Sequence, residues 1–306
     1  MRSGTLVLAA AATALVAPAL AHAGTGTGLL RYLPDSASAV VVVDVAHARS
    51  GAAIGKLVQR LRESTPRWEA LAADGVALDA MIDTLVAGSD AGIEDPHGRH
   101  VTIVIDGKLG PLLAHLKTPA SPATRHAGVT YWMIDGGEVA IVDRHLLITT
   151  AGDMAAAIDR AHGKGASAAA SPKAAELRDV LAASASSGAD VWGGLVFEPS
   201  SRTNLRDVLM GSEPTWVAFA IAAAGRASLE IRLAFVAEPA ARSAVTFLQH
   251  TLVGPDSQAY TWMRSGIGSD FADSFSVEQD ASQVRMSAAM TVDEADQVGK
   301  LLGTWL

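Results

Sequence analysis

The apolar positions of this chain alternate between short extended runs and helical stripes. Residues 39–45 read Ala-Val-Val-Val-Val-Asp-Val, and four consecutive valines favour an extended backbone whose side chains leave on both faces. We therefore expect a strand there that is buried on both faces, with the domain built around it. Similar runs predict further strands at residues 82–87, 101–105, 191–197, 216–223, 229–235, 275–278 and 284–290.

The clearest local signal is a pair of closely spaced hairpins. Extended runs at residues 131–135 and 138–143 are separated by the glycines at residues 136–137, which predicts a two-residue turn. The Arg-His dipeptide at residues 144–145 predicts a second turn into a strand at residues 146–150. These segments together predict an antiparallel meander.

Stripes with the helical period separate the strands. Asp153 precedes one stripe as an N-cap, and Gly163 follows it as a C′ residue. Thr291 and Glu294 form a capping box before the last stripe. Helices are predicted at residues 50–61, 110–116, 154–162, 174–183, 204–209, 239–252 and 292–305, while residues 254–271 show no clear period.

Each half of the chain repeats one order of elements, with the first half starting at Val40 and the second at Val191. This order predicts an internal duplication in architecture. Hairpins that alternate with helices favour an α+β fold with largely antiparallel sheets and helices packed on them. The expected organisation is a signal peptide (1–23), an N-terminal α+β half (24–165), an Ala/Ser-rich connection with a helix (166–188) and a C-terminal α+β half (189–306).

The N-terminus has the pattern of a secretory signal peptide. Arg2 supplies a positive start, residues 5–20 are apolar, and Ala-His-Ala at residues 21–23 fits the small-x-small cleavage pattern. A membrane anchor is the alternative, but the run is shorter than the ~20 residues that a span needs and contains Pro18. We therefore expect cleavage before Gly24, a periplasmic or secreted protein, and no later transmembrane segment.

Composition narrows the classes of function further. Hydrophobic residues make up 49% of the chain and charged residues 18%, which is typical of a globular protein. The chain contains no cysteine, so thiol catalysis, thiolate zinc sites and disulfides are excluded. The formal net charge is −8 and no basic stripe is visible, which argues against nucleic acid or an anionic membrane surface as a partner.

The best candidate for a metal site is the sequence Glu-Asp-Pro-His-Gly-Arg-His at residues 94–100. His97 and His100 lie beside two carboxylates, and imidazole and carboxylate are ligands that suit zinc. The alternative is a polar turn between two strands, which Pro96 and Gly98 would explain without a metal.

The sequence evidence for a catalytic site is weaker than the evidence for a metal site. Asp44, Asp106, Asp135 and Asp143 lie near predicted strand ends, where two of them could converge as a general acid/base pair. Aspartate also favours turns because its side chain bonds nearby backbone amides, which is the competing interpretation. The chain has no G-x-S-x-G elbow, P-loop, H-E-x-x-H or EF-hand motif. No catalytic residue and no cofactor is therefore assigned.

Tryptophan supplies the remaining candidates for ligand contacts. Six tryptophans are present, and most are expected to anchor the core because large aromatic side chains dominate burial. Trp68 and Trp262 lie in segments without clear periodicity, so we expect those two on the surface.

The start of the mature chain carries one family resemblance. Leu33-Pro34-Asp35-Ser36, followed by the valine-rich strand that ends at Asp44, resembles the start of a family of uncharacterised exported bacterial proteins. That family has no established activity, so the resemblance implies only an exported, non-catalytic chain.

Three functions remain open from the sequence. The first is an exported non-enzymatic binding, scaffold or envelope-associated protein of unknown ligand or protein partner, with a cleft between the halves as its natural ligand site. The second is an exported hydrolase, metal-assisted through His97 and His100. The third is a carrier of an apolar ligand such as a lipid, held between sheet and helices.

Overall fold

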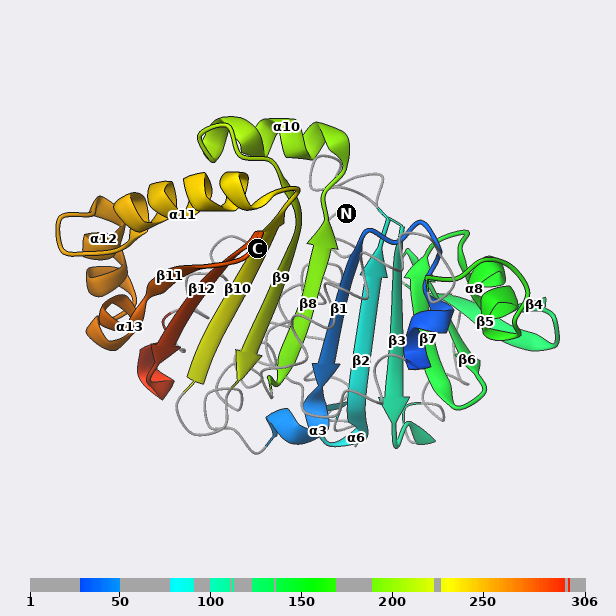
Figure 1. Cartoon of the computed structure of the whole chain (residues 1–306). Coiled ribbons are helices and arrows are strands. Elements are labelled where there is room, and N and C mark those ends of the chain that lie inside the picture. The colour runs from blue at the N-terminus through cyan, green and yellow to red at the C-terminus, as the bar shows by residue number, and fades with distance from the viewer. Residues whose placement is uncertain are drawn as a thin grey trace.

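A computed structural model describes residues 28–49, 78–90, 100–110, 112, 123–134, 136–168, 189–222, 227–294 and 297. Over these residues the chain forms one 12-stranded sheet in the order β11-β12-β10-β9-β8-β1-β2-β3-β7-β6-β5-β4, and all neighbours are antiparallel (Figure 1). The strands are β1 (Ala39–Asp44), β2 (Ile82–Ser89), β3 (Val101–Gly107), β4 (Ala123–His126), β5 (Val129–Ile134), β6 (Gly137–Val142), β7 (His145–Thr150), β8 (Val191–Val196), β9 (Pro214–Ala222), β10 (Ala227–Phe235), β11 (Ser276–Asp280) and β12 (Gln283–Met290).

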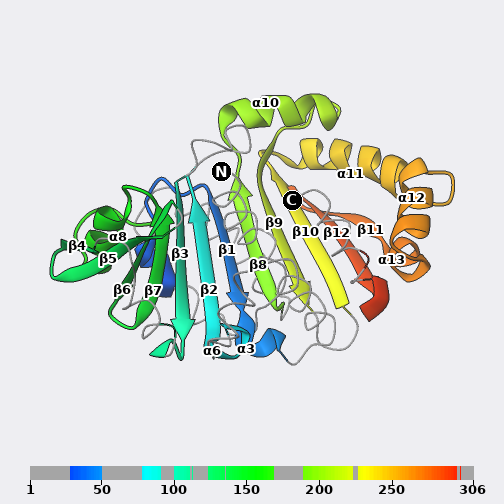
Figure 2. The ribbon, with the colours of Figure 1, turned by 180° about the vertical axis from the view of Figure 1, so that it is seen from behind.

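Helices flank this sheet, which confirms the mixed α and β composition and the largely antiparallel pairing. In Figures 1 and 2, α8 lies beside the β4–β7 end of the sheet, and α11 to α13 lie beside the β10–β12 end. The helices are the 3-10 turn η1 (Leu30–Tyr32), α3 (Val45–Ala48), α6 (Leu78–Met81), α8 (Met154–Ala161), α10 (Pro199–Val208), α11 (Glu238–Leu252), α12 (Gln258–Gly266) and α13 (Ser269–Ser274).

The valine-rich strand β1 lies in the middle of the sheet, as its composition predicts. It pairs with β2 on one side and β8 on the other. Val40 and Val42 are fully buried in one core cluster, whereas Val43 is buried in a second cluster on the other face. The prediction of a central strand buried on both faces is therefore confirmed.

The β1–β8 pair also joins the two halves of the chain. Strands β1 to β7 come from residues before 151, and strands β8 to β12 come from residues after 190. Val42 pairs with Trp192 and Val43 with Val191 in an unbroken antiparallel register. The expected cleft between the halves is therefore replaced, within the sheet, by a hydrogen-bonded strand pair.

The predicted meander is present, but each turn comes one residue earlier than expected. Gly137 is already the first residue of β6 and pairs with Ile134, and His145 is the first residue of β7 and pairs with Val142. Gly136 (φ 84°) and Asp143 (φ 57°) occupy the turns, in the left-handed region that glycine and aspartate tolerate best.

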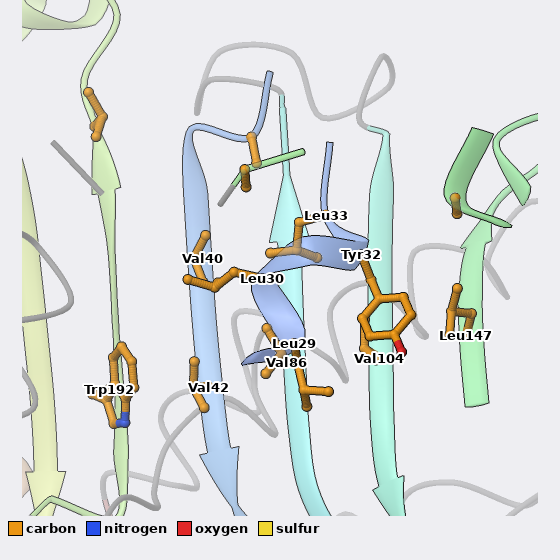
Figure 3. Close-up of a cluster of buried hydrophobic side chains, with 14 of the residues drawn as sticks. Leu29, Leu30, Tyr32, Leu33, Val40, Val42, Val86, Val104, Leu147 and Trp192 are labelled. Atoms are coloured by element: carbon orange, nitrogen blue, oxygen red, sulfur yellow. The ribbon is translucent and has the colours of Figure 1, made fainter. Parts of the chain in front are cut away.

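One face of the sheet, called here the η1 face, carries the larger core cluster. Figure 3 shows η1 lying across β1 to β3, with Leu30 and Leu33 close to the side chains of the strands. Gly88 of β2 permits this approach, because a methyl group there would lie 2.7 Å from Leu33 Cδ1. The apolar residues just after the predicted signal peptide thus form part of the core.

The helix of the N-terminal half is capped differently from the prediction. The side chain of Asp153 makes no capping hydrogen bond to α8. The buried carboxylate of Glu138, from β6, accepts the Met154 backbone N–H at 2.8 Å instead. Sequence spacing could not show this, because the capping residue comes from a different strand of the folded sheet.

Helices of the C-terminal half cover the opposite face. Along α11 the predicted stripe is confirmed, since Ala241, Ala244, Val245 and Leu248 are buried. Residues 254–271, unassigned from periodicity, contain α12 and the first half of α13. The capping box is confirmed as well, because Thr291 Oγ1 accepts the Glu294 N–H and Glu294 Oε2 accepts the Thr291 N–H.

Several predicted segments lie outside the described residues. These are the signal peptide, the helices at residues 50–61 and 174–183, most of the helix at 110–116, and most of the final helix. Within the described part of the chain, no helix combines the length and apolar character needed to cross a bilayer.

Candidate functional site

An open hollow of about 480 Å³ lies over strands β9, β10 and β12. The register places it on the η1 face, because Val42 pairs with Trp192, Trp192 with Ala220, and Ala220 with Glu230. Strand alternation then brings every second residue of β10 and β12 to this face. The lining residues are Ala220, Ala222, Ser228, Leu229, Glu230, Arg232, Ser274, Arg285, Ser287, Ala288 and Ala289.

Small side chains account for the open space. Ala222 and Ala289 both pair with Ser228, and Ala220 and Ser287 both pair with Glu230. No residue of these pairs has an aromatic or branched apolar side chain that could fill the region. The hollow therefore follows from a row of Ala and Ser positions on neighbouring strands.

One carboxylate and two guanidinium groups form the polar part of the hollow. Arg232 Nε donates to Glu230 Oε1 at 2.6 Å, and Arg285 donates to Glu230 Oε2 from Nη2 at 2.8 Å and from Nε at 3.0 Å. The side chains are 13% exposed for Glu230, 22% for Arg232 and 43% for Arg285. Charge-assisted hydrogen bonds of this kind are strong, and partial burial reduces their screening by water.

Hydroxyl groups border this ion-pair network. Ser287 Oγ and Ser276 Oγ are 2.8 Å apart and share a hydrogen bond across β11 and β12. Ser274 Oγ donates to the Ala289 carbonyl at 2.8 Å and accepts the Ala289 N–H. The site therefore combines two cations, one anion and neutral hydroxyls around a space large enough for a small molecule.

The sequence patterns did not predict this site, although they place two of its charged residues together. The alternation in residues 229–235 places Glu230 and Arg232 on one face of a half-buried strand. Arg285 is 53 positions after Arg232, and only the pairing of β10 with β12 brings the two residues opposite each other.

The predicted metal ligands are placed as follows. His97 lies outside the described residues, and His100 Nδ1 is 2.6 Å from Asp153 Oδ2. Asp153 raises the pKa of His100 through this hydrogen bond and through its charge. Among described residues, no group of three or more His, Asp or Glu side chains is arranged to hold a metal ion. The metal hypothesis for His97 and His100 stays a prediction.

Two of the predicted carboxylates, Asp44 and Asp106, do not meet as a pair. Asp44 pairs with Thr84 and Thr84 with Asp106, which places the two aspartates on one face but two strand spacings, about 10 Å, apart. Asp44 Oδ1 accepts the His47 N–H at 2.9 Å, which is the local role that the turn interpretation predicts. Asp135 lies outside the described residues.

Asp143 and Asp106 both border a cluster around Tyr32 and His145, which fastens η1 to the sheet. The buried hydroxyl of Tyr32 lies 3.2 Å from Asp143 Oδ2 and 3.0 Å from His145 Nδ1, and it accepts from Arg31 Nη2 at 2.8 Å. His145 Nε2 lies 3.6 Å from Asp106 Oδ1. Because Tyr32 is fully buried, we interpret these groups as a structural clamp that holds η1 against the sheet.

This clamp predicts a pH dependence of stability. Burial lowers the pKa of His145 below its ordinary value of 6.5, aided by Arg144 and Arg31 and opposed by Asp106 and Asp143. Below pH 6.5 the unfolded chain then binds the proton more readily than the folded one, so the free energy of unfolding falls as the pH is lowered. We expect urea titrations between pH 7.5 and 5 to show a weaker fall for His145→Gln than for the wild type.

His100 offers a matched control with the opposite sign. Its pKa is raised, so its small stabilising contribution is present below pH 6.5 and is lost as the pH rises through its folded-state pKa. His100→Gln should therefore make the fall toward acid slightly steeper. If the free energy of unfolding of His145→Gln fell with pH as steeply as that of the wild type, the lowered pKa would not belong to His145.

The described tryptophans include buried core residues and one exposed residue, largely as expected. Trp192 and Trp216 are buried in the core, whereas Trp262, on α12, is 56% exposed. Trp68 and Trp305 lie outside the described residues. None of the four described tryptophans lines the hollow.

Comparison with known proteins concerns the fold. No protein-family model matches the chain, and no curated protein matches it. Two solved structures of TP0453, crystal forms III and IV, align with 89% of this chain at TM-scores of 0.52 and 0.50, covering 97% and 95% of those chains at 9% sequence identity. At this identity the similarity shows a shared α+β architecture and nothing about activity.

Proposed function

We propose that this chain is an exported, non-enzymatic binding protein whose small polar ligand occupies the hollow over β9, β10 and β12. The observation that carries the proposal is a space of about 480 Å³ lined by convergent polar groups. Small-molecule sites typically have this size and a few placed polar groups that orient the ligand.

The chemistry of the lining supports binding over catalysis. The carboxylate of Glu230 is held by three hydrogen bonds from two arginines, which leaves it poorly placed to take up and release a substrate proton. Among the described residues that line the hollow there is no histidine, tyrosine or lysine that could serve as another acid or base. Arginine and serine side chains also suit a polar ligand better than the apolar ligand of the carrier hypothesis.

Export and duplication form part of the proposal. The apolar run before Ala21-His22-Ala23 supports a cleaved signal and a periplasmic or secreted location, where the protein would act as a binding, scaffold or envelope-associated module. The strand order is symmetric about the β1–β8 pair, with β2 and β3 on one side and β9 and β10 on the other. This symmetry supports an internal duplication of two similar halves.

A ligand screen on the mature chain tests the proposal. We would follow thermal unfolding with amino acids, mono- and dicarboxylates, sugars and nucleosides, and compare the wild type with Ala289→Phe, which fills the hollow. We expect at least one class to raise the midpoint of unfolding in the wild type and not in Ala289→Phe, because the phenyl ring would occupy the ligand's space.

Thr246→Phe provides the matched control, since it adds the same ring to an exposed position on α11. This control should respond to ligand like the wild type. The proposal fails if no compound stabilises the wild type, or if Ala289→Phe retains the full response.

A further inference from the structure

We infer that the ligand of the hollow is a monoanion that presents one carboxylate to Arg232 and Arg285. This inference rests on the proposed function and names the ligand class for the same site. The observations that carry it are the placement of the two guanidinium groups, the count of charges around them and the hydrogen-bond donors that remain.

The two arginines are direct cross-strand partners. Arg232 of β10 pairs with Arg285 of β12 on the same face of the sheet. Like charges directly opposite one another destabilise a sheet unless something compensates them. Glu230 compensates one of the two charges, because it bonds both guanidinium groups.

Among the described residues of the lining, one positive charge therefore remains. Glu278 lies opposite Arg285 on the edge strand β11, yet the structure shows no ion pair between these two side chains. Within the part of the chain that the structure describes, the lining contains two arginines, one glutamate and otherwise uncharged residues. A ligand with a single negative charge would balance this set.

Arg232 also has N–H groups that can donate hydrogen bonds to a ligand. Its Nε is bonded to Glu230, but within the described part of the chain no hydrogen bond from its Nη1 or Nη2 to a protein group is present. The side chain is only 22% exposed, so its position is restricted and its charge is partly shielded from water. A guanidinium fork presents two parallel N–H groups that match the two oxygens of a carboxylate.

A guanidinium group can bind a phosphate as well as a carboxylate, and the net charge of the ligand distinguishes these two candidates. A phosphate monoester carries about −1.5 to −2 charges at neutral pH, so it would leave excess negative charge beside Glu230. A carboxylate carries one negative charge, which matches the one uncompensated positive charge among the described lining residues. The neighbouring Ala220, Ala222 and Ala289 leave room for the rest of a small molecule.

Three probes of similar shape test this directly: benzoate, benzamide and phenyl phosphate, with acetate, acetamide and methyl phosphate as a smaller series. Calorimetric titration of the mature protein should detect carboxylate binding that is at least about tenfold stronger than binding of the matched amide or phosphate. Arg232→Gln and Arg285→Gln should each weaken carboxylate binding by at least about tenfold. Arg232→Lys, which keeps the charge but loses the fork, should give a smaller loss.

Arg242→Gln is the control, because Arg242 is an exposed arginine on α11 paired with Glu238 and away from the hollow. Its carboxylate affinity should equal that of the wild type. Glu230→Gln adds one net positive charge to the site and should shift preference from benzoate toward phenyl phosphate.

The outcomes separate this inference from the proposed function. If neutral compounds bind in a manner that Ala289→Phe abolishes but Arg232→Gln does not change, the proposed site stands and the carboxylate inference is overturned. If phenyl phosphate binds the wild type more tightly than benzoate, the charge argument is overturned. If no compound binds, both fail.

Discussion

Gly193→Ala is expected to cost the protein at least about 3 kcal/mol of stability, more than most single substitutions. Gly193 lies in β8 and pairs with Val41 of β1, in the strand pair that joins the two halves. A β-carbon at this position would overlap the Val40 carbonyl oxygen and lie 2.9 Å from Val41 Cα. Both atoms belong to the backbone, so relief requires β1 and β8 to separate.

Urea denaturation followed by tryptophan fluorescence measures this effect. Gly110→Ala is the control, because no atom lies within 4 Å of its added methyl group, and it should leave stability nearly unchanged. The methyl group at residue 193 would also lie 3.2 Å from Phe219 Cζ. Phe219→Leu should not rescue Gly193→Ala if the backbone contact is the cause; full rescue would assign the effect to side-chain crowding instead.

The second large loss of stability is expected on substitution of Glu294. Its one carboxylate accepts backbone N–H groups at the starts of two helices. Its Oε2 accepts the Thr291 N–H at 2.7 Å, and its Oε1 accepts the Phe271 N–H of α13 at 3.1 Å. Glu294→Ala leaves the buried Phe271 N–H and the partly buried Thr291 N–H without this acceptor. Because a lost cap costs about 1 kcal/mol and an unsatisfied buried donor about 1–3 kcal/mol, we expect a loss of about 3 kcal/mol.

The pH dependence of Glu294 provides an independent check. Burial alone would raise its pKa, but hydrogen bonds from Thr291 and Phe271 outweigh burial and hold the pKa below the ordinary value of 4.5. A depressed folded-state pKa gives stability that is present above pH 4.5 and is lost as the pH falls through the folded-state pKa. The stability difference between wild type and Glu294→Gln should therefore shrink on acidification.

Glu278→Gln, at an exposed position on β11, is the control for this titration. It should follow the wild type at all pH values. A Glu294→Gln difference that stays constant from pH 7 to pH 3 would show that the carboxylate charge is not what stabilises the two helix starts.

Local patterns predicted the elements well where the signal is contained in a few residues. The valines of β1, the period of α11 and the Thr291–Glu294 capping box each depend on neighbours within a turn or a strand, and the structure contains all three. Signals that depend on other segments were missed. Glu138 caps α8 from another strand, and residues 254–271 fold into helices although their apolar stripe is short.

By itself, the sequence determined the positions of most strands and of α11, the absence of disulfides and thiol chemistry, and the α+β class, because these follow from composition and short-range periodicity. Only the tertiary structure decided that the halves share one continuous sheet and that Arg285 lies opposite Arg232 around Glu230. The reason is physical: strand register sets which distant side chains meet, and backbone pairing is chosen by the packing of the whole sheet.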